Sequence, residues 1–196
     1  MKIIGITGGI GTGKSTVLNI LEKEYGAFIV ETDKLAHQLM SPGEEAYQST
    51  VETFGKDILC DDNTIDRGKL GSIVFNNKDM LCELNKIVHP AVKKYILEDI
   101  ELKNKQGCVE YYVIEAALLI EDGYKAICDE IWYIYASQEV RIQRLIEGRG
   151  KDAEKWLQVI ANQSSEDYYR RCCDVTIDNG DSIEKTFVTI KELLKK

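Results

Sequence analysis

The chain has 196 residues, of which 44% are apolar and 30% are charged, a composition that excludes an intrinsically disordered protein. It carries 25 Lys and Arg against 33 Asp and Glu, and its net charge of −8 argues against non-specific nucleic-acid binding, which requires a basic face. This balance leaves room for a local basic pocket that binds a small phosphorylated ligand.

The N-terminal segment enters an apolar strand at once, without the apolar core and cleavage site of a signal peptide. The most apolar stretch, residues 111–120, is shorter than the ~18 residues of a membrane span and contains Glu115. The six cysteines form no C-x-x-C pair and there are only two histidines, so zinc-ligand spacing is absent. We therefore expect a cytoplasmic protein whose reduced thiols mostly pack as small core residues, with no nucleic-acid, membrane or obligate protein partner.

Short apolar segments rich in Ile, Val and Tyr alternate with helical patterns along most of the chain. In chain order we predict a strand at 3–6, a helix at 14–25, strands at 28–30, 109–117 and 131–135, a helix at 139–146, a strand at 175–177 and a helix at 182–194. Gly26 is placed to cap the first helix at its C-terminus. The pattern predicts an α/β fold, a doubly wound five-stranded parallel sheet with helices on both faces.

Residues 34–106 break this alternation and predict a helical insert at the carboxyl edge of the sheet. Its predicted helices are 33–40, 44–54, 69–75, 79–87 and 90–103. We place Pro90 at the first position of the last helix, with His89 just before it. A second excursion, at about residues 141–163, is charged and helical.

Residues 8–15, Gly-Gly-Ile-Gly-Thr-Gly-Lys-Ser, match the pattern G-x-x-x-x-G-K-[ST] of a phosphate-binding loop. Its glycines allow backbone N–H groups to surround a polyphosphate, and the helix that starts near Lys14 directs its positive end at the same place. Lys14 would reach the β- and γ-phosphates, and the Ser15 hydroxyl could ligate Mg²⁺. The alternative is a glycine-rich turn that matches by chance. The strand before the loop and the amphipathic helix after it favour a nucleotide-binding loop.

The loop alone does not define the reaction, because switches, motors and small-molecule kinases share it. Asn77-Lys78-Asp79 is one residue short of the guanine-binding pattern N-K-x-D. The small size, the helical insert and the charged excursion favour a phosphotransferase that encloses its substrates and excludes water.

Asp33 follows the second predicted strand, at the edge of the sheet where ligands bind. Its carboxylate could orient an acceptor hydroxyl and take its proton, or it could only N-cap the helix from Lys34. Arg67 could bind an acceptor phosphate or be solvated, and His89 fits an N-cap or a satisfied polar group better than a ligand contact.

Three arginines lie in the charged excursion: Arg141, Arg144 and Arg149. At least one of them could stabilise the charge that spreads over a phosphoryl group in transfer. The alternative is a solvated helix face, on which Arg141 and Arg144 are neighbours.

Several separated motifs resemble the dephospho-coenzyme A kinase family over almost the whole chain. They are Ile4–Thr16, Thr32–His37 leading to Pro42-Gly43, Ile65–Leu70, Val74-Phe75, Leu84–Pro90, Leu118–Glu121, Gln143–Leu145 and Ile177–Asn179. The chain departs from the family at His37, where many members have Arg, and at Ala117, where many have Pro. Gly148 stands where a second lid arginine is common, with Arg149 one place on, so the second lid cation stays open.

The resemblance implies ATP-dependent phosphorylation of the ribose 3′-hydroxyl of dephospho-CoA, the last step of coenzyme A biosynthesis, with Mg²⁺ accompanying ATP. It implies a P-loop NTPase core of residues 1–33, 107–140 and 164–196, an acceptor-binding domain at 34–106 and a lid at 141–163. It assigns catalysis to Lys14, Asp33 and Arg144. It assigns ATP binding to Gly11, Thr12, Gly13, Lys14, Ser15, Thr16, Arg149 and Asn179, and acceptor binding to Thr7, Arg67 and His89.

Two other functions stay open on the residues alone. One is another small-molecule kinase, for a nucleoside, a nucleotide or a sugar acid. The other is a nucleotide-dependent switch or binding module that hydrolyses slowly. Turnover with a panel of acceptors separates the first from the resemblance, and failure of every acceptor to stimulate ATP consumption would favour the second.

Overall fold

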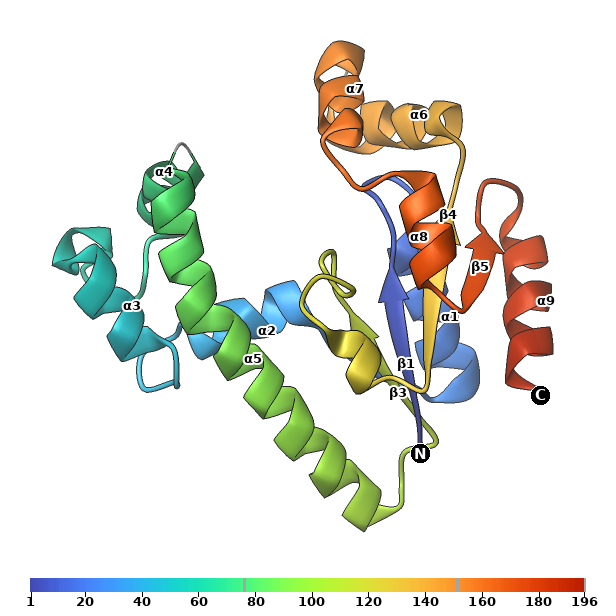
Figure 1. Cartoon of the computed structure of the whole chain (residues 1–196), viewed down its shortest axis with the longest axis horizontal. Coiled ribbons are helices and arrows are strands. Elements are labelled where there is room, and N and C mark those ends of the chain that lie inside the picture. The colour runs from blue at the N-terminus through green and yellow to red at the C-terminus, as the bar shows by residue number, and fades with distance from the viewer. Residues whose placement is uncertain (76, 151, 196) are drawn as a thin grey trace. The chain divides into compact units, whose positions relative to one another are not determined.

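A computed structural model describes residues 1–75, 77–150 and 152–195 and divides the chain into two compact units (Figure 1). The first unit comprises Met1–Val30 and Gly107–Lys196, and the second comprises Glu31–Gln106.

The first unit is built on a five-stranded sheet with the strand order β2-β3-β1-β4-β5. The strands are β1 (Lys2–Thr7), β2 (Phe28–Glu31), β3 (Tyr111–Glu115), β4 (Glu130–Tyr135) and β5 (Val175–Asp178). The central strand β1 pairs in parallel with β3 and β4, which confirms the predicted α/β sheet. The third strand is shorter than the predicted 109–117, because a turn follows it, in which the Asp122 N–H bonds the Leu118 carbonyl.

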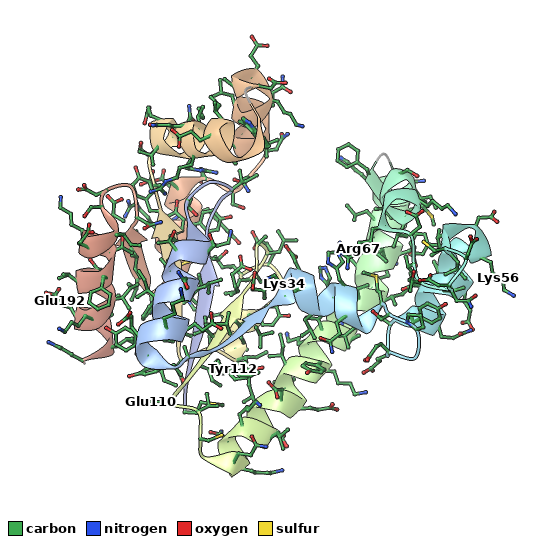
Figure 2. The ribbon with its side chains drawn as sticks, turned by 180° about the vertical axis from the view of Figure 1, so that it is seen from behind. Lys34, Lys56, Arg67, Glu110, Tyr112 and Glu192 are labelled. Carbon is green, nitrogen blue, oxygen red and sulfur yellow. The ribbon has the colours of Figure 1, made fainter. Side chains whose placement is uncertain are left out.

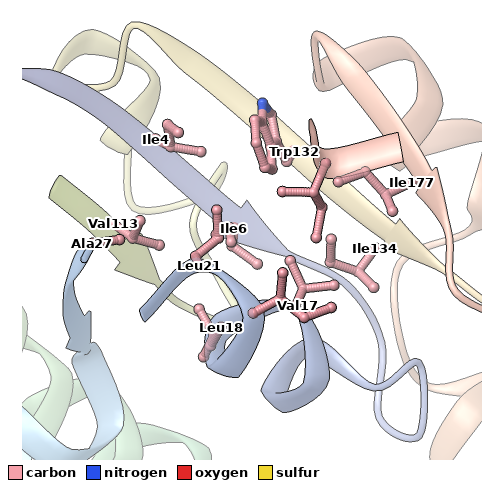
Figure 3. Packing of buried hydrophobic residues seen from close by; sticks show 12 residues of the cluster. Ile4, Ile6, Val17, Leu18, Leu21, Ala27, Val113, Trp132, Ile134 and Ile177 are labelled. Atoms are coloured by element: carbon pink, nitrogen blue, oxygen red, sulfur yellow. The ribbon is translucent and has the colours of Figure 1, made fainter. Parts of the chain in front are cut away.

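One large core lies between the sheet and α1 (Lys14–Tyr25), with Ile190 of α9 (Ile183–Leu194) in the same cluster (Figure 3). Val17 and Leu21 of α1 are fully buried in the same cluster as Ile4 and Ile6 of β1. Gly26 ends α1 in a left-handed conformation, at φ 61°, and its N–H bonds the Glu22 carbonyl, so the predicted cap is confirmed.

Three further helices complete the first unit: α6 (Gln138–Arg149), α7 (Ala153–Ala161) and α8 (Glu166–Cys172). Tyr169 of α8 stacks on Tyr133 of β4 with ring centroids 4.8 Å apart. Serine side chains cap three helices of this unit, as Ser137, Ser165 and Ser182 accept N–H groups of α6, α8 and α9. A short 3-10 helix lies at Tyr124–Ala126.

The second unit is helical, as predicted, and consists of α2 (Thr32–Leu39), α3 (Tyr47–Phe54), α4 (Arg67–Phe75) and α5 (Lys78–Gln106), with a 3-10 turn at Lys56–Ile58. The long helix α5 packs against α2, α3 and α4. Its buried side chains recur at helical spacing: Val88, Ala91, Val92, Ile96 and Ile100.

The predicted break at Pro90 is wrong, because α5 runs through it as one helix. Proline has no N–H for the Lys86 carbonyl, which usually disrupts a helix. Here Pro90 and Lys86 are both exposed, so water can satisfy that carbonyl, while Val88 and Val92 hold the helix on its buried side. His89 is therefore an interior residue of α5 and not an N-cap.

The expectation that the cysteines mostly pack in the core is also wrong. Cys60, Cys82 and Cys108 are exposed and the other three are half-buried, although all six are free thiols. Burial raises the pKa of Cys128 to about 12, so this thiol stays protonated at neutral pH. In the described part of the chain, no helix is both long and apolar enough to cross a membrane.

Candidate active site

The phosphate-binding loop connects β1 to α1, and at two of its positions the backbone has a conformation that only glycine adopts without strain. Gly11 and Gly13 have left-handed φ angles of 79° and 84°. Inside the loop, the Thr12 hydroxyl donates to the Gly9 carbonyl at 2.9 Å and is buried. Thr12 therefore stabilises the turn, and the backbone of the loop is the part that a ligand can meet.

The ammonium group of Lys14 is held at the loop by two oxygen atoms. Its Nζ donates to the Gly8 carbonyl at 2.9 Å and lies 3.4 Å from Oε1 of Glu115. Both side chains are largely buried, with 19% and 13% of their surface exposed. Glu115 is the last residue of β3, and sequence reasoning noted it only as a charge in an apolar run. The predicted strand ran to residue 117, so the sequence did not place Glu115 at the end of the strand, where the structure has it.

The first turn of α1 carries the candidate magnesium ligand. Ser15 is exposed, so its side-chain hydroxyl is accessible. The next residue, Thr16, donates its backbone N–H to the Gly13 carbonyl at 3.0 Å. Magnesium usually keeps several waters and takes one or two protein oxygens together with substrate phosphates. A single accessible hydroxyl beside the loop fits that chemistry. No cluster of three or more His, Cys, Asp or Glu side chains that could hold a metal occurs among the described residues.

Arg144 of α6 lies against the loop. Its Nη1 donates to the Thr12 carbonyl at 3.2 Å, and its Nη2 donates to the Asn179 carbonyl at 2.7 Å. These two bonds leave other guanidinium N–H groups beside the loop available to an anion, because arginine carries five donors. The alternative of a solvated helix face is therefore wrong for Arg144.

Arg141 also contacts the loop, both directly and together with Gln163, a residue that the sequence analysis did not single out. Its Nε donates to the Ile10 carbonyl at 2.8 Å, and its Nη2 donates to Oε1 of Gln163 at 2.6 Å. The same Gln163 oxygen accepts the Ile10 N–H at 3.0 Å. Half-burial lowers the pKa of Arg141, but an arginine starts so high that it keeps its charge.

Asn179 follows β5 and is buried, with 3% of its surface exposed. Its Nδ2 lies 2.8 Å from the Thr12 carbonyl and 3.3 Å from the Gly13 carbonyl. Thr7, at the end of β1, is fully buried and donates its hydroxyl to the Ala117 carbonyl at 3.5 Å. The side chain of Arg149 lies outside the described part of the chain.

In the helical unit, Asp33 is exposed in the first turn of α2. The helix begins at Thr32 with Glu31 as its N-cap residue, so the alternative in which Asp33 caps a helix from Lys34 is wrong. Arg67 is the first residue of α4, where it is exposed (Figure 2). His89 is half-buried in α5.

A cavity of about 410 Å³ lies within the helical unit. Its polar lining residues are His37, Ser41, Thr64 and Arg67, and most of the others are apolar. The pKa of His37 is below its ordinary value, mainly because of burial and then because of the positive charge of Arg67, although Asp33 opposes the shift. The cavity suits a partly apolar ligand that carries negative charge.

The parallel sheet, with a glycine loop, a lysine and arginines at the end of its central strand, defines a P-loop nucleotide-binding protein. The family model for dephospho-CoA kinase matches residues 2–185. The chain therefore belongs to the dephospho-CoA kinase family, as its motifs indicated.

Relatives and solved structures agree with this assignment over the full length. The chain is 41% identical over 196 residues to a dephospho-CoA kinase of Carboxydothermus hydrogenoformans, covering 100% of this chain and 94% of the relative. The structure of TT1252 from Thermus thermophilus has a TM-score of 0.80 and 26% identity, with 99% and 96% of the two chains covered. A dephospho-CoA kinase from Campylobacter jejuni has a TM-score of 0.73 and 27% identity, with 100% and 98% covered.

Members of this family use ATP to phosphorylate dephospho-CoA, the final step of coenzyme A biosynthesis. The predicted enzyme class, a kinase with an alcohol acceptor, is thereby confirmed. The other two functions left open by the residues, a different small-molecule kinase and a nucleotide switch, are not supported.

Proposed function

We propose that this chain transfers the γ-phosphoryl group of ATP to the ribose 3′-hydroxyl of dephospho-CoA, using the phosphate-binding loop for ATP and the helical unit for the acceptor. The 3′-oxygen forms a bond to the γ-phosphorus while the bond from that phosphorus to the β,γ-bridging oxygen breaks. The hydroxyl proton passes to a carboxylate, and ADP leaves. The observation that carries the proposal is the convergence of Lys14 and Arg144 on one anion-binding backbone turn.

In this proposal, backbone N–H groups of the loop, including those of Gly13 and Lys14, face the ATP phosphates, and Lys14 exchanges its present oxygen partners for the β- and γ-phosphates. Arg144 stabilises the charge on the equatorial oxygens of the transferring group. The Ser15 hydroxyl would hold the magnesium ion that accompanies ATP, and that ion would supply further positive charge against the phosphates. Arg149 is our candidate for a second cation.

Asp33 is the proposed general base. Its support is an exposed carboxylate that the helix does not use as a cap, two residues beyond the end of β2. A carboxylate at such a position can orient the acceptor hydroxyl toward the phosphorus and accept its proton.

We assign acceptor binding to residues 34–106 and the lid to residues 141–163, with residues 1–33, 107–140 and 164–196 as the nucleotide-binding core. The cavity beside Arg67 supports the first assignment, because dephospho-CoA combines a negatively charged diphosphate with a long, partly apolar arm. His89 is a further proposed acceptor contact. Free thiols support a cytoplasmic location, and the proposal requires no nucleic-acid, membrane or obligate protein partner.

The direct test incubates the protein with ATP, Mg²⁺ and dephospho-CoA and follows the formation of CoA and ADP by mass spectrometry. We expect CoA to form only when all three are present, and 2′-deoxy and 3′-deoxy analogues of the acceptor identify the hydroxyl. Loss of turnover with the 3′-deoxy analogue alone supports the proposal. Phosphorylation of a nucleoside or sugar acid in preference to dephospho-CoA would contradict it, as would ATP hydrolysis that no acceptor stimulates.

A further inference from the structure

The side chain of Asn179 joins the phosphate-binding loop to the C-terminal helix. On one side its Nδ2 donates to the carbonyls of Thr12 and Gly13, at 2.8 and 3.3 Å. On the other side its Oδ1 accepts the hydroxyl of Thr186, in α9, at 2.9 Å. Thr186 is fully buried, and its hydroxyl lies farther, 3.4 Å, from the Ser182 carbonyl. Every polar atom of the Asn179 side chain is therefore used within the protein.

Together with Arg144 on the Thr12 carbonyl and the Thr16 N–H on the Gly13 carbonyl, these bonds help to set the direction of the loop N–H groups. In a trans peptide unit the C=O and the N–H point in opposite directions. Holding the Thr12 carbonyl on Asn179 therefore turns the Gly13 N–H away from Asn179. Holding the Gly13 carbonyl does the same for the N–H of Lys14. These are groups that a phosphate-binding loop presents to its ligand.

The two loop carbonyls select the orientation of the Asn179 amide, and the Thr186 hydroxyl anchors its Oδ1. If the amide turned over, Oδ1 would face the carbonyl oxygens of Thr12 and Gly13, so acceptors would oppose acceptors on the loop side. In the observed orientation the Thr186 hydroxyl donates to Oδ1 and holds the side chain against the loop. The contact is also close-packed, since a Cβ on Gly13 would lie 2.3 Å from Nδ2 of Asn179. The loop backbone and the amide thus fit only in one arrangement.

We propose that Thr186 is a positioning residue for ATP binding, which acts through Asn179 to hold the loop N–H groups toward the phosphates. The inference rests on the proposed function, because it supposes that the loop binds ATP. Thr186 does not touch the ligand and takes no part in the transfer. Its hydroxyl fixes Asn179, Asn179 fixes two carbonyls, and those carbonyls direct the opposite N–H groups.

The test is Thr186→Val, which removes the hydroxyl and keeps the branched shape. Thr189→Val is the matched control, because Thr189 lies one turn further along α9 and its hydroxyl donates to the Lys185 carbonyl of its own helix, at 3.0 Å. Thr186→Ser restores the hydroxyl. For each variant, calorimetry measures ATP affinity without acceptor, kinetics measure KM for ATP and for dephospho-CoA, and thermal melts measure stability.

We expect Thr186→Val to weaken ATP binding and raise KM for ATP by about fivefold to twentyfold, a change of about 1–2 kcal/mol. KM for dephospho-CoA should stay within twofold, Thr189→Val should match the wild type, and Thr186→Ser should recover most of the affinity. If Thr186→Val lowers the melting temperature but leaves ATP affinity unchanged, Thr186 is only structural and the inference is wrong.

Three further outcomes can be distinguished. If Thr186→Val does not fold, Thr186→Ala removes the same hydroxyl without placing a methyl group against the amide, and the same affinity criterion applies to it. If the wild type itself does not bind ATP, the proposed function fails, and the inference fails with it. If the wild type binds ATP and the folded hydroxyl-free variant binds it equally well, only the inference fails.

Discussion

The phosphate-binding loop and the cavity of the helical unit meet their ligands in different ways. Carbonyls of the loop are held by Asn179, Arg141 and Arg144, so the shape of the loop is fixed by buried or half-buried side chains. The cavity is lined by apolar side chains and a few exposed polar ones, such as Arg67. A triphosphate is common to many enzymes and can be bound by a rigid backbone, whereas an individual acceptor must be recognised by side chains.

The substitution Asp33→Asn tests whether Asp33 accepts the proton of the acceptor's hydroxyl. We expect kcat to fall by roughly 10²–10⁴-fold, the usual contribution of a general base, because asparagine cannot accept the proton. ATP affinity and the melting temperature should hardly change, since Asp33 is exposed and does not cap α2. Turnover, calorimetry and melts decide the outcome.

The matched control for this change is Asp79→Asn, an exposed acidic residue in the first turn of α5. It should behave as the wild type. A loss of less than about threefold in kcat for Asp33→Asn would remove the base assignment, given the range expected for such a group.

The substitution Lys14→Met tests the loop side. We expect a loss of roughly 10²–10³-fold in kcat, the typical effect of removing one group that stabilises transition-state charge. The fold should persist, because the core face of α1 is carried by Val17, Leu18 and Leu21. Lys23→Met, in the last turn of the same helix, is the control. Full activity of Lys14→Met in a transfer assay would contradict the role of the loop.

The substitution Gly71→Leu tests the cavity without touching the loop. Gly71 lies inside α4 and lines the cavity, and a Cβ there meets nothing within 4 Å. We expect KM for dephospho-CoA to rise about tenfold, equal to about 1.4 kcal/mol of lost binding, with KM for ATP unchanged. The melting temperature should not fall, because leucine is about 1 kcal/mol more favourable than glycine inside a helix.

Ser72→Leu adds the same side chain one residue on, at an exposed position that does not line the cavity. It should leave both KM values unchanged. If Gly71→Leu also leaves KM for dephospho-CoA unchanged while the wild type is active, the acceptor does not use this cavity.

The smallest expected effect concerns the charge of His37. Its pKa lies below the ordinary 6.5, so at pH 7 the imidazole is neutral, and it gains a positive charge only as the pH falls below that value. We expect dephospho-CoA affinity to increase about twofold to threefold as the pH falls from 7.5 to well below 6.5, because the diphosphate of the acceptor is negative. His37→Arg should show high affinity throughout, and His37→Gln low affinity throughout. Equal pH profiles for all three proteins would contradict this role.

Local sequence patterns were sufficient for much of the fold. The apolar runs predicted all five strands, and Gly26 marked the end of α1, because strand burial and helix capping depend on neighbouring residues. The predicted helix break at Pro90 was wrong, because whether a helix accepts a proline depends on which side of the helix faces solvent, and the local sequence does not show that side. The cysteines misled it as well, because residue type alone does not determine burial.

The loop could be located from its motif, but most of its supporting contacts could not. Asn179 bonds Thr12 across 167 residues, and Gln163 bonds Ile10 across 153 residues. Such contacts depend on how distant strands and helices pack, which no local spacing records. Thr186 and Gln163 belong to no sequence motif, so their places beside the loop and Asn179 could be seen only in the structure.

The ion pair between Lys14 and Glu115 gives the loop its own internal counterion. A ligand must displace a carboxylate that is tethered next to the lysine and therefore has a high effective concentration. Chloride or a single phosphate carries little charge with which to displace Glu115 from Lys14. A triphosphate offers several charges and several donors at once, so the exchange selects for polyphosphates before any contact with the base or the sugar is made.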